Sequence, residues 1–319
     1  MHPENLGCIT IKANMGLKTT ATLDQILAEF ISSIDVSKGT AASYKAILIS
    51  FIRWLQVSLK SPDIFEAGLP DLLRWKGYLQ ENHRATTQRL YVTVIKRFYY
   101  WGESMGYFDN VAGKLKTPKA INGGLRRPLN VEQSKQLLTS IQQNTITGTR
   151  DYAILNLLLV NGLRLIEVCR MDISDFYQRP YVSIQGKGRH DKSDYIRLWP
   201  HTLNAIDVYL SQRGNDENSA LFCSHSPQNP GTRLTPKYLS SRIRFYLDEI
   251  GLTSKAGYCA HSLRHSTASI LREQGVTVDE ISRKLRHSSL AITQRYIHFI
   301  DQELKQRDKP GELLESLIF

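Results

Sequence analysis

His261-Ser262-Leu263-Arg264-His265 is the most informative stretch of this 319-residue chain, and it decides which fold we expect. Two further motifs follow it, Leu285-Arg286-His287-Ser288-Ser289 and Arg295-Tyr296-Ile297-His298. A fourth, Asn161-Gly162-Leu163-Arg164-Leu165-Ile166-Glu167, lies about a hundred residues earlier. Together the four motifs supply two arginines, two histidines and a tyrosine at defined intervals. Such a set suits the transfer of a phosphoryl group to a tyrosine.

The chemistry of phosphoryl transfer explains why these residue types belong together. Charge builds on the non-bridging oxygens of a phosphodiester under attack. Arg164 and Arg264 could clamp those oxygens, because guanidinium is always charged and can donate two parallel hydrogen bonds. Tyr296 is the candidate nucleophile, and since its phenol is weak at neutral pH, His261 and His287 could assist it by hydrogen bonds beside the phosphate. No set of metal ligands is then required.

These motifs resemble those of the tyrosine recombinase family, which includes phage integrases and Xer-like recombinases. The likeness rests on Gly162–Glu167, His261–His265, Leu285–Ser289 and Tyr296, which follows His287 by nine residues. It implies an enzyme that needs no cofactor and in which Tyr296 forms a 3′-phosphotyrosine and releases a 5′-hydroxyl. A different strand then religates, so that two specific DNA sites recombine. In this scheme His261 is the base or a base-like hydrogen bonder, and His287 donates to the transition state.

The resemblance also implies a mainly α chain of two domains, with a small β-hairpin or sheet in the C-terminal domain, that closes on DNA as a C-shaped clamp. We expect a flexible arm over residues 1–20, a helical core-binding domain over 21–116, a basic linker over 117–128 and a catalytic domain over 129–300. Glycine, proline and positive charge gather in residues 110–128, as is typical of an extended linker. The tail, residues 301–319, carries apolar residues at helical spacing and is expected to dock, either on a neighbouring protomer of a tetramer or on its own chain.

Apolar residues at helical spacing predict four helices in the first domain. One begins at the capping box Thr22–Gln25, one spans Tyr44–Leu55, one runs from Pro70 to Leu79, and the fourth begins near Thr86. The fourth helix places apolar residues on one side and basic residues on another, which is a face that could lie in a major groove or simply be solvated. The candidate DNA-binding residues on this helix and the linker are Arg89, Lys96, Arg97, Lys116 and Lys119.

A β-hairpin is predicted between the first motif and the second. Val182 and Ile184 alternate before a glycine, and a second strand follows Asp194. In the family a lysine in such a hairpin protonates the leaving 5′-oxygen, and Lys187 matches its position. The loop is about two residues longer than the family's commonest one, so Lys192 stays a second candidate.

Two positions depart from the family's pattern without removing a reacting group. Asn161 stands where threonine is usual, and Arg286 stands where glycine usually precedes the histidine, which adds a charge beside the site. Glu167, one helical turn after Arg164, resembles the family's acidic residue behind the site, and it could orient Arg164 or a histidine.

Composition agrees with a nucleic-acid partner. The chain has 41 Lys and Arg against 30 Asp and Glu, a net charge of +11, which attracts phosphate. Its four cysteines are widely spaced, which favours a reducing compartment and argues against a zinc ribbon or a disulfide framework. No apolar run is long enough to span a bilayer. We therefore expect a cytoplasmic, nucleoid-associated protein.

Three alternatives are weighed against a recombinase. His261 and His265 have the spacing of a helical zinc motif, but Ser262 replaces the glutamate that such proteases need, so we predict no metal site. A type IB topoisomerase-like enzyme would use the same residues and relax DNA without exchanging partners. A DNA-binding regulator with an inactive site would bind without cleaving, although every reacting group is present. A chromosome-resolving role and a mobile-element role are equally compatible with these motifs.

Overall fold

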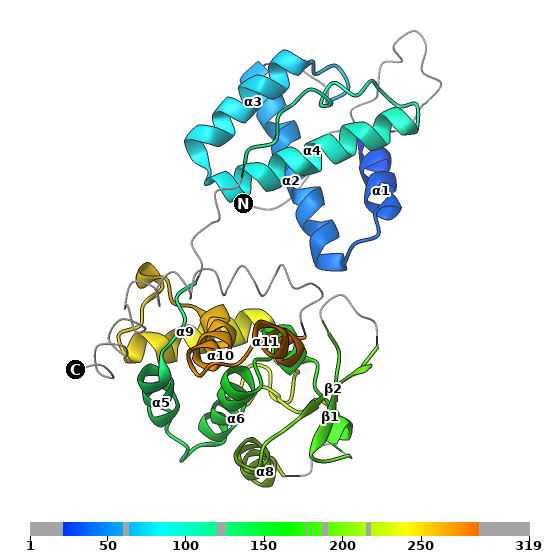
Figure 1. The fold of residues 1–319 in the computed structure, drawn as a ribbon. Coiled ribbons are helices and arrows are strands. Elements are labelled where there is room, and N and C mark those ends of the chain that lie inside the picture. The colour runs from blue at the N-terminus through cyan, green and yellow to red at the C-terminus, as the bar shows by residue number, and fades with distance from the viewer. Residues whose placement is uncertain are drawn as a thin grey trace, which may run out of the picture. The chain divides into compact units, whose positions relative to one another are not determined.

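A computed structural model of the protein describes residues 22–59, 64–119, 126–176, 178–186, 191–214 and 218–286. The chain divides into two compact units, Met1–Gly123 and Gly124–Phe319, and each unit has its own hydrophobic core. The described residues are mainly helical, with one two-stranded antiparallel sheet in the second unit (Figure 1). The prediction of a mainly α chain with a small hairpin is thus confirmed.

The helices described in the first unit match the four predicted ones: three begin within one residue of the predicted start, and the second begins six residues before Tyr44. They are α1 (Leu23–Ser33), α2 (Lys38–Leu59), α3 (Leu69–Asn82) and α4 (Ala85–Ser104). At the start of α1 the Thr22 hydroxyl accepts a hydrogen bond from the Gln25 backbone N–H, and the Gln25 side chain accepts one from the Thr22 N–H. This reciprocal pair is the capping box that the sequence predicts, and it satisfies two amides that the first turn leaves without partners.

α4 packs against each of the other three helices described in the first unit, α1, α2 and α3. Its residues Val94, Ile95 and Phe98 are fully buried. The Phe98 ring meets the edge of Phe30 at 5.3 Å between centroids and lies 5.2 Å from Phe108. Burying an aromatic or large aliphatic side chain contributes about 1.5–3 kcal/mol, so this apolar side of α4 holds the unit together.

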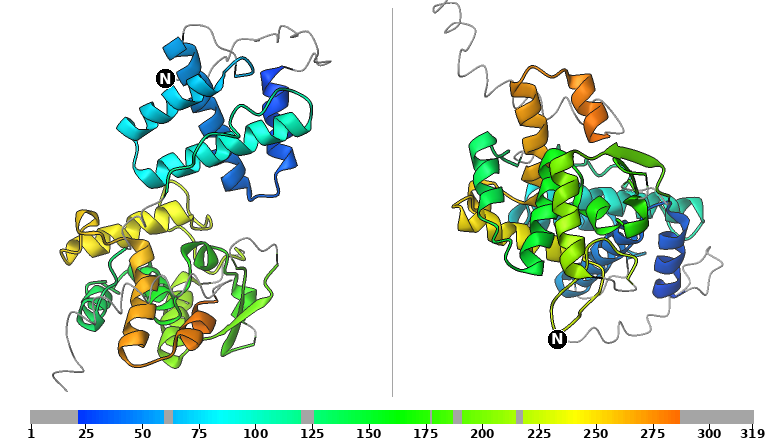
Figure 2. Two further views of the ribbon diagram at one scale, coloured as in Figure 1. Left: turned by 45° about the horizontal axis from the view of Figure 1, so that its top comes forward. Right: turned by 90° about the horizontal axis from the view of Figure 1, so that it is seen from below.

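The second unit is built around one central helix. Its helices are α5 (Val131–Thr139), α6 (Ile146–Val160), α7 (Leu165–Cys169), α8 (Pro200–Arg213), α9 (Pro236–Glu249), α10 (Ala260–Glu273) and α11 (Val278–Leu285). Single 3₁₀ turns span Ile173–Phe176 and Ser254–Ala256. α6 is buried on nearly all sides, and it contacts α5, α7, α8 and α10. Figure 2 shows α6 lying beside α8 within this unit. A helix that is buried on nearly all sides belongs in a core, and the apolar second half of α6 supplies much of that core.

The hairpin follows α7 and consists of β1 (Tyr181–Ile184) and β2 (Asp194–Arg197). The strands pair antiparallel, with Val182 opposite Ile196 and Ile184 opposite Asp194. Val182, Ile184 and Ile196 are buried, as the alternation of side chains along a strand requires when one face is packed on the core. The loop between the strands contains Lys187.

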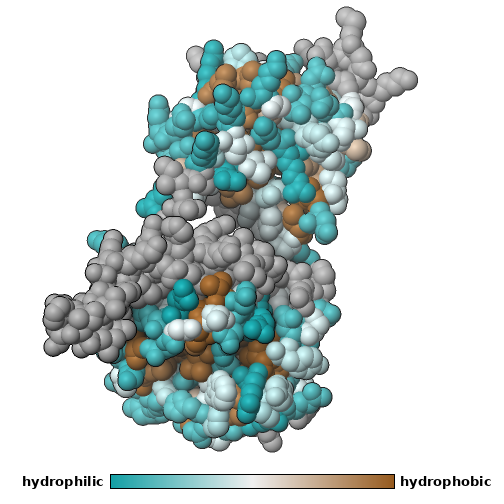
Figure 3. All heavy atoms as spheres, in the orientation of Figure 1, coloured by the Kyte–Doolittle hydropathy of each residue, from teal (hydrophilic) through white to brown (hydrophobic). Residues whose placement is uncertain are grey.

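The surface of the described residues is predominantly hydrophilic in the view of Figure 3, with smaller apolar areas on both units. Among the described helices, none combines the length and the apolar composition that crossing a bilayer would demand.

Candidate active site

Arg264 lies in the first half of α10, and it is buried, with only 5% of its surface exposed. One end of its guanidinium donates to the Gly162 carbonyl oxygen, and the other donates to the Leu285 carbonyl oxygen. Both acceptors belong to the predicted motifs. Arg264 therefore fastens together three segments that are far apart in the sequence.

The turn between α6 and α7 sets the place of Arg164. Gly162 has φ +61°, which favours glycine, and a Cβ atom there would lie 2.5 Å from Leu285 Cδ2. Thr267 of α10 donates its hydroxyl to the Leu159 carbonyl at 2.7 Å and so holds the end of α6. Arg164 follows as the residue that caps the N-terminus of α7. The chain thus folds back sharply and presents Arg164 beside α10 and α11.

Glu167 is fully buried and contacts two arginines. One carboxylate oxygen, Oε1, accepts from Arg164 Nη1 at 2.7 Å. The other, Oε2, accepts from the Arg164 backbone N–H at 2.8 Å and from Arg286 Nη2 at 2.9 Å. Burial raises the pKa of this carboxyl, but the charge of Arg286 and the hydrogen bonds from Arg164 outweigh burial, and the pKa is lowered overall. Glu167 is therefore a buried carboxylate held ionised between two guanidinium groups.

The sequence motifs predicted that Glu167 contacts Arg164 or a histidine. The contact with Arg164 is present, and the contact with Arg286 was not predicted. Arg286 ends α11 with φ 52° and ψ 52°, in the left-handed region. The only signal for its role was the positive charge at a position where the family usually has glycine. Because Glu167 and Arg286 are 119 residues apart in the sequence, helical periodicity could not reveal the pair.

Of the two candidate lysines, only Lys192 is described, and its ammonium group is bound by two carboxylates. Lys192 Nζ lies 2.7 Å from Asp172 Oδ2 and 2.6 Å from Asp175 Oδ2. Ser183 of β1 donates to Asp175 at 3.1 Å, so these contacts fasten the end of the loop to the body of the unit. Lys187 lies outside the described residues.

His261 and His265 lie one turn apart on α10, with their ring centres 4.7 Å apart and nearly perpendicular. His261 is exposed, while His265 is 7% exposed. In the described part of the chain, no three or more His, Cys, Asp or Glu side chains gather as a metal site would need. His287 and Tyr296 lie outside the described residues, as do the predicted arm and tail. The described half of the candidate catalytic set is therefore Arg164, His261 and Arg264.

The candidate DNA-binding residues of the first unit fall into two groups. Arg89, Arg97, Lys116 and Lys119 are exposed. Lys96 is instead partly buried, and its ammonium group donates to the carbonyl oxygens of Gly113 and Leu115 at 3.3 and 2.9 Å. In this position Lys96 holds the chain that follows α4 against the helix.

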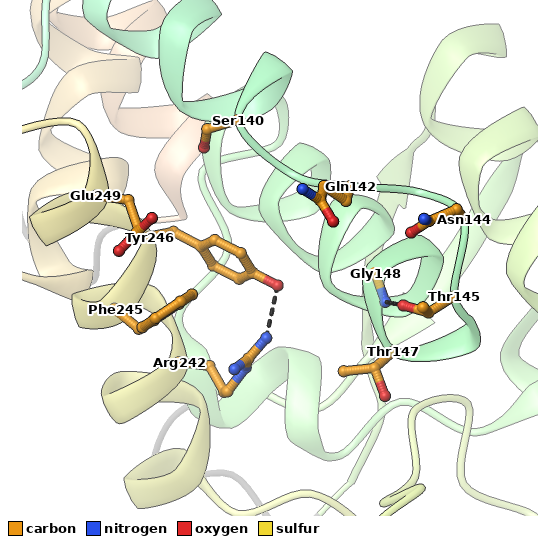
Figure 4. A pocket seen from close by; sticks show the side chains of 10 residues that line it. All are labelled: Ser140, Gln142, Asn144, Thr145, Thr147, Gly148, Arg242, Phe245, Tyr246 and Glu249. Carbon is orange, nitrogen blue, oxygen red and sulfur yellow. Dashed lines mark hydrogen bonds between the residues drawn. The ribbon is translucent and has the colours of Figure 1, made fainter.

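A cavity of about 270 Å³ lies at the N-terminal end of α6 (Figure 4). It is remote from Arg164, which follows the C-terminal end of that helix. At its edge, Asp151 accepts from Arg242 at 3.1 Å and from the Tyr246 hydroxyl at 2.9 Å. Burial and the nearby Asp151 charge raise the pKa of Tyr246 to about 12. On its other oxygen Asp151 pairs with the fully buried Arg150. We interpret this cluster as a structural one, since each charge has an oppositely charged partner.

Comparison with known proteins identifies relatives of this arrangement. The family model described as the phage integrase family matches residues 127–303. The tyrosine recombinase XerC of Myxococcus xanthus is 30% identical over 240 residues, which cover 72% of this chain and 77% of that protein. The tyrosine recombinase XerA of Pyrococcus furiosus is 30% identical over 247 residues, which cover 77% of this chain and 79% of that protein.

Solved structures share the fold at low sequence identity. The post-cleavage complex of the XerH site-specific recombinase with palindromic difH aligns with a TM-score of 0.71 at 19% identity and covers 91% of this chain and 84% of that one. A lambda integrase dimer bound to a COC′ core site aligns with a TM-score of 0.65 at 15% identity, over 85% of this chain and 96% of that one.

Proposed function

The chain belongs to the phage integrase family of tyrosine recombinases, and from this premise we propose that it is a site-specific DNA recombinase. It cleaves a DNA strand through a 3′-phosphotyrosine intermediate and rejoins it to a different strand, so that DNA is integrated, excised or resolved. The observation that carries the proposal is the position of Arg264. Its buried guanidinium joins the turn before Arg164 to the end of the helix that precedes His287, and so gathers the separate motifs at one place.

The proposed mechanism assigns each charge to a step. Arg164 and Arg264 hold the non-bridging oxygens of the scissile phosphate and stabilise the charge that develops on them. Tyr296 attacks the phosphorus, while His261 accepts or shares its proton and His287 donates a hydrogen bond to the phosphate. The ester bond to the tyrosine conserves the energy of the broken phosphodiester, so rejoining needs no nucleotide.

A lysine completes the cleavage step by protonating the leaving 5′-oxygen, and we assign this role to Lys187. Support comes from Lys192, whose ammonium group is bound by Asp172 and Asp175. Both carboxylates accept hydrogen bonds from this ammonium group, so Lys192 is already engaged in holding the end of the loop.

Duplex DNA is the partner that this chemistry requires. We propose that the two units close around the duplex as a clamp, with Arg89, Arg97, Lys116 and Lys119 contacting phosphates, and that four protomers act on two duplexes. The tail, residues 301–319, which carries apolar residues at helical spacing, then docks either on a neighbouring protomer or on its own chain. The net charge of +11 supports binding to DNA, and the protein would act in the cytoplasm at the nucleoid.

A recombination assay tests the proposal. A plasmid carrying two copies of a segment from the DNA that flanks the protein's own gene is incubated with the protein in EDTA. We expect products in which the DNA between the copies has been deleted or inverted. Relaxed plasmid without exchanged flanks would point to a topoisomerase instead, and binding with neither product would point to a regulator.

A further inference from the structure

Arg286 has an unusual backbone for an arginine. It ends α11 in the left-handed region, and among the described residues other than glycine it alone has positive φ. A side chain with a Cβ is strained there. Strain at one residue is kept only where surrounding contacts determine the conformation, so the contacts of Arg286 must hold it in this conformation.

The contact that accompanies this strain is the ion pair with Glu167. Arg286 Nη2 lies 2.9 Å from Glu167 Oε2, while Arg164 Nη1 lies 2.7 Å from Oε1 of the same carboxylate. The carboxylate is fully buried, and 15% of the Arg286 side chain is exposed. The group of three therefore contains one negative and two positive charges, and it keeps a net charge of +1.

Because Arg164 and Arg286 share the Glu167 carboxylate, Arg164 keeps more of its positive charge for a phosphate. A buried carboxylate paired with a single arginine would cancel much of the charge that the arginine offers to a phosphate. With Arg286 on its other oxygen, the same carboxylate still fixes the orientation of Arg164 and neutralises less of its charge. The oxygen that Arg286 contacts also accepts from the Arg164 backbone N–H, so Arg286 acts on the start of α7 as well.

We propose that Arg286 is a positioning residue for Arg164, which shares the Glu167 carboxylate and thereby keeps Arg164 oriented and cationic toward the scissile phosphate. The inference rests on the proposed function, because it takes Arg164 to be a phosphate-binding residue. Arg286, the residue directly before His287, would thus act on the phosphate-binding residue through the Glu167 carboxylate and not by touching the phosphate itself.

Electrostatics gives the proposal a second, independent readout. The charged groups that act on Glu167 are Arg164 and Arg286. Arg286 is itself influenced by Arg164 and Asp194, and it acts in turn on Lys284. After burial, which raises the pKa of Glu167, the charge of Arg286 is the largest influence and lowers it. Removing Arg286 should raise that pKa. Glu167 would then be protonated, and release Arg164, as pH falls through the raised value.

Substitution of Arg286→Gly is the direct test, since glycine adopts the left-handed backbone without strain. Arg286→Asn provides a second uncharged variant that tolerates the same backbone. Arg283→Gln is the matched control, because Arg283 is an exposed arginine on the same helix whose described hydrogen bond is to its own helix, at the Asp279 carbonyl. The assay measures the rate at which the full chain forms a covalent adduct with a nicked duplex, alongside DNA affinity and circular dichroism.

We expect Arg286→Gly and Arg286→Asn to lower the rate of adduct formation by about 10- to 100-fold, the usual effect of losing a partner that orients a reacting group. DNA affinity should change by less than about threefold, because one buried cation contributes little to the sum of phosphate contacts. The rate of Arg286→Gly should fall further as pH is lowered from about 8 to about 5, more steeply than that of the wild type. Methylguanidinium should restore part of the rate, and sodium chloride at equal ionic strength should not.

Two results would overturn the inference. One is a wild-type rate and pH profile for Arg286→Gly. The other is a loss of rate that is matched by loss of folding and of DNA binding in both uncharged variants, which would make Arg286 merely structural. If the wild-type protein itself forms no adduct while Arg283→Gln and wild type bind DNA equally, the proposed function fails instead, and the two failures are thereby distinguished.

Discussion

At the scale of single residues, Arg264 illustrates how geometry restricts the choice of side chain. Its two donors reach carbonyl oxygens of Gly162 and Leu285 that lie on different segments. Only a planar, forked cation can donate to both carbonyl oxygens at once. Lysine has the charge but is a single point donor.

We therefore expect Arg264→Lys to fail although it preserves the charge. Adduct formation should slow by about 10²- to 10³-fold, the usual loss on removing a group that stabilises transition-state charge. The protein should also lose about 1–3 kcal/mol of stability, because a buried carbonyl would be left without a donor. Single-turnover cleavage of a nicked duplex and urea denaturation measure the two effects.

Arg272→Lys serves as the control on the same helix, since Arg272 lies in the last turn of α10, away from the motif. A cleavage rate for Arg264→Lys equal to that of Arg272→Lys would contradict the assigned role.

The sequence predicted the residue types at this scale better than their contacts. Glu167 was expected to orient Arg164 or a histidine, and the structure shows a contact with Arg164. The pairing of Glu167 with Arg286 could not be predicted, because it joins α7 to the end of α11 through tertiary packing that no local pattern records. Lys96 is a similar case: its basic helical face was expected to contact phosphates or to be solvated, and the structure adds a contact that was not predicted, in which carbonyls of the following segment bind its ammonium group.

At the scale of elements, the turn between α6 and α7 positions Arg164 and the carbonyl oxygen that Arg264 contacts. Gly162 combines positive φ with close packing, since an added Cβ would lie 2.5 Å from a methyl group of Leu285. Gly275, after α10, also has positive φ, but an added Cβ would have no heavy atom within 4 Å. Comparing the same substitution at the two glycines therefore separates the energetic cost of backbone strain from that of steric overlap.

Substituting Gly162→Ala should destabilise the protein by about 2–4 kcal/mol, from strain and overpacking together. Gly275→Ala should cost about 1 kcal/mol, from strain alone. Urea denaturation measures both. We also expect Gly162→Ala to slow cleavage, since the displaced carbonyl is an acceptor of Arg264. Equal destabilisation by the two substitutions would show that the turn is not packed against Leu285 as described.

The hairpin is the other element that the site depends on. Its strands were predicted from alternation and turn residues, but the long loop left Lys187 and Lys192 as rival proton donors. In the structure two carboxylates bind the ammonium group of Lys192. The hairpin therefore carries two lysines for which we propose different roles, Lys187 in proton transfer and Lys192 in fastening the loop, and their positions in the sequence alone could not tell them apart.

A substrate with sulfur in place of the leaving 5′-oxygen can separate the two lysines, because a thiolate leaves without being protonated. We expect Lys187→Ala to cleave the normal substrate poorly and the sulfur substrate nearly as fast as wild type. Lys192→Met should show a smaller defect that is equal on both substrates. Rescue of Lys192→Met rather than Lys187→Ala by sulfur would reverse the assignment.

At the scale of the whole molecule, the chain consists of a helical first unit and a second unit that also contains a hairpin, and each unit has its own hydrophobic core. The first four helices and the hairpin were predictable because their apolar periodicities are local. The packing of α6 at the centre of the second unit was not, because its buried residues surround the helix and give no amphipathic pattern. We ascribe the function to the motifs of the second unit, which Arg264 joins. The central claim is that Tyr296 cleaves DNA without a metal ion.

Covalent trapping tests that claim most directly. The protein is incubated in EDTA with nicked duplexes drawn from the DNA flanking its own gene, and protease-sensitive protein–DNA adducts are sought. We predict an adduct in which the 3′-phosphate is joined to Tyr296, and its complete loss in Tyr296→Phe, which removes only the attacking oxygen. An adduct that persists in Tyr296→Phe, or DNA binding without any adduct across all flanking fragments, would contradict the account.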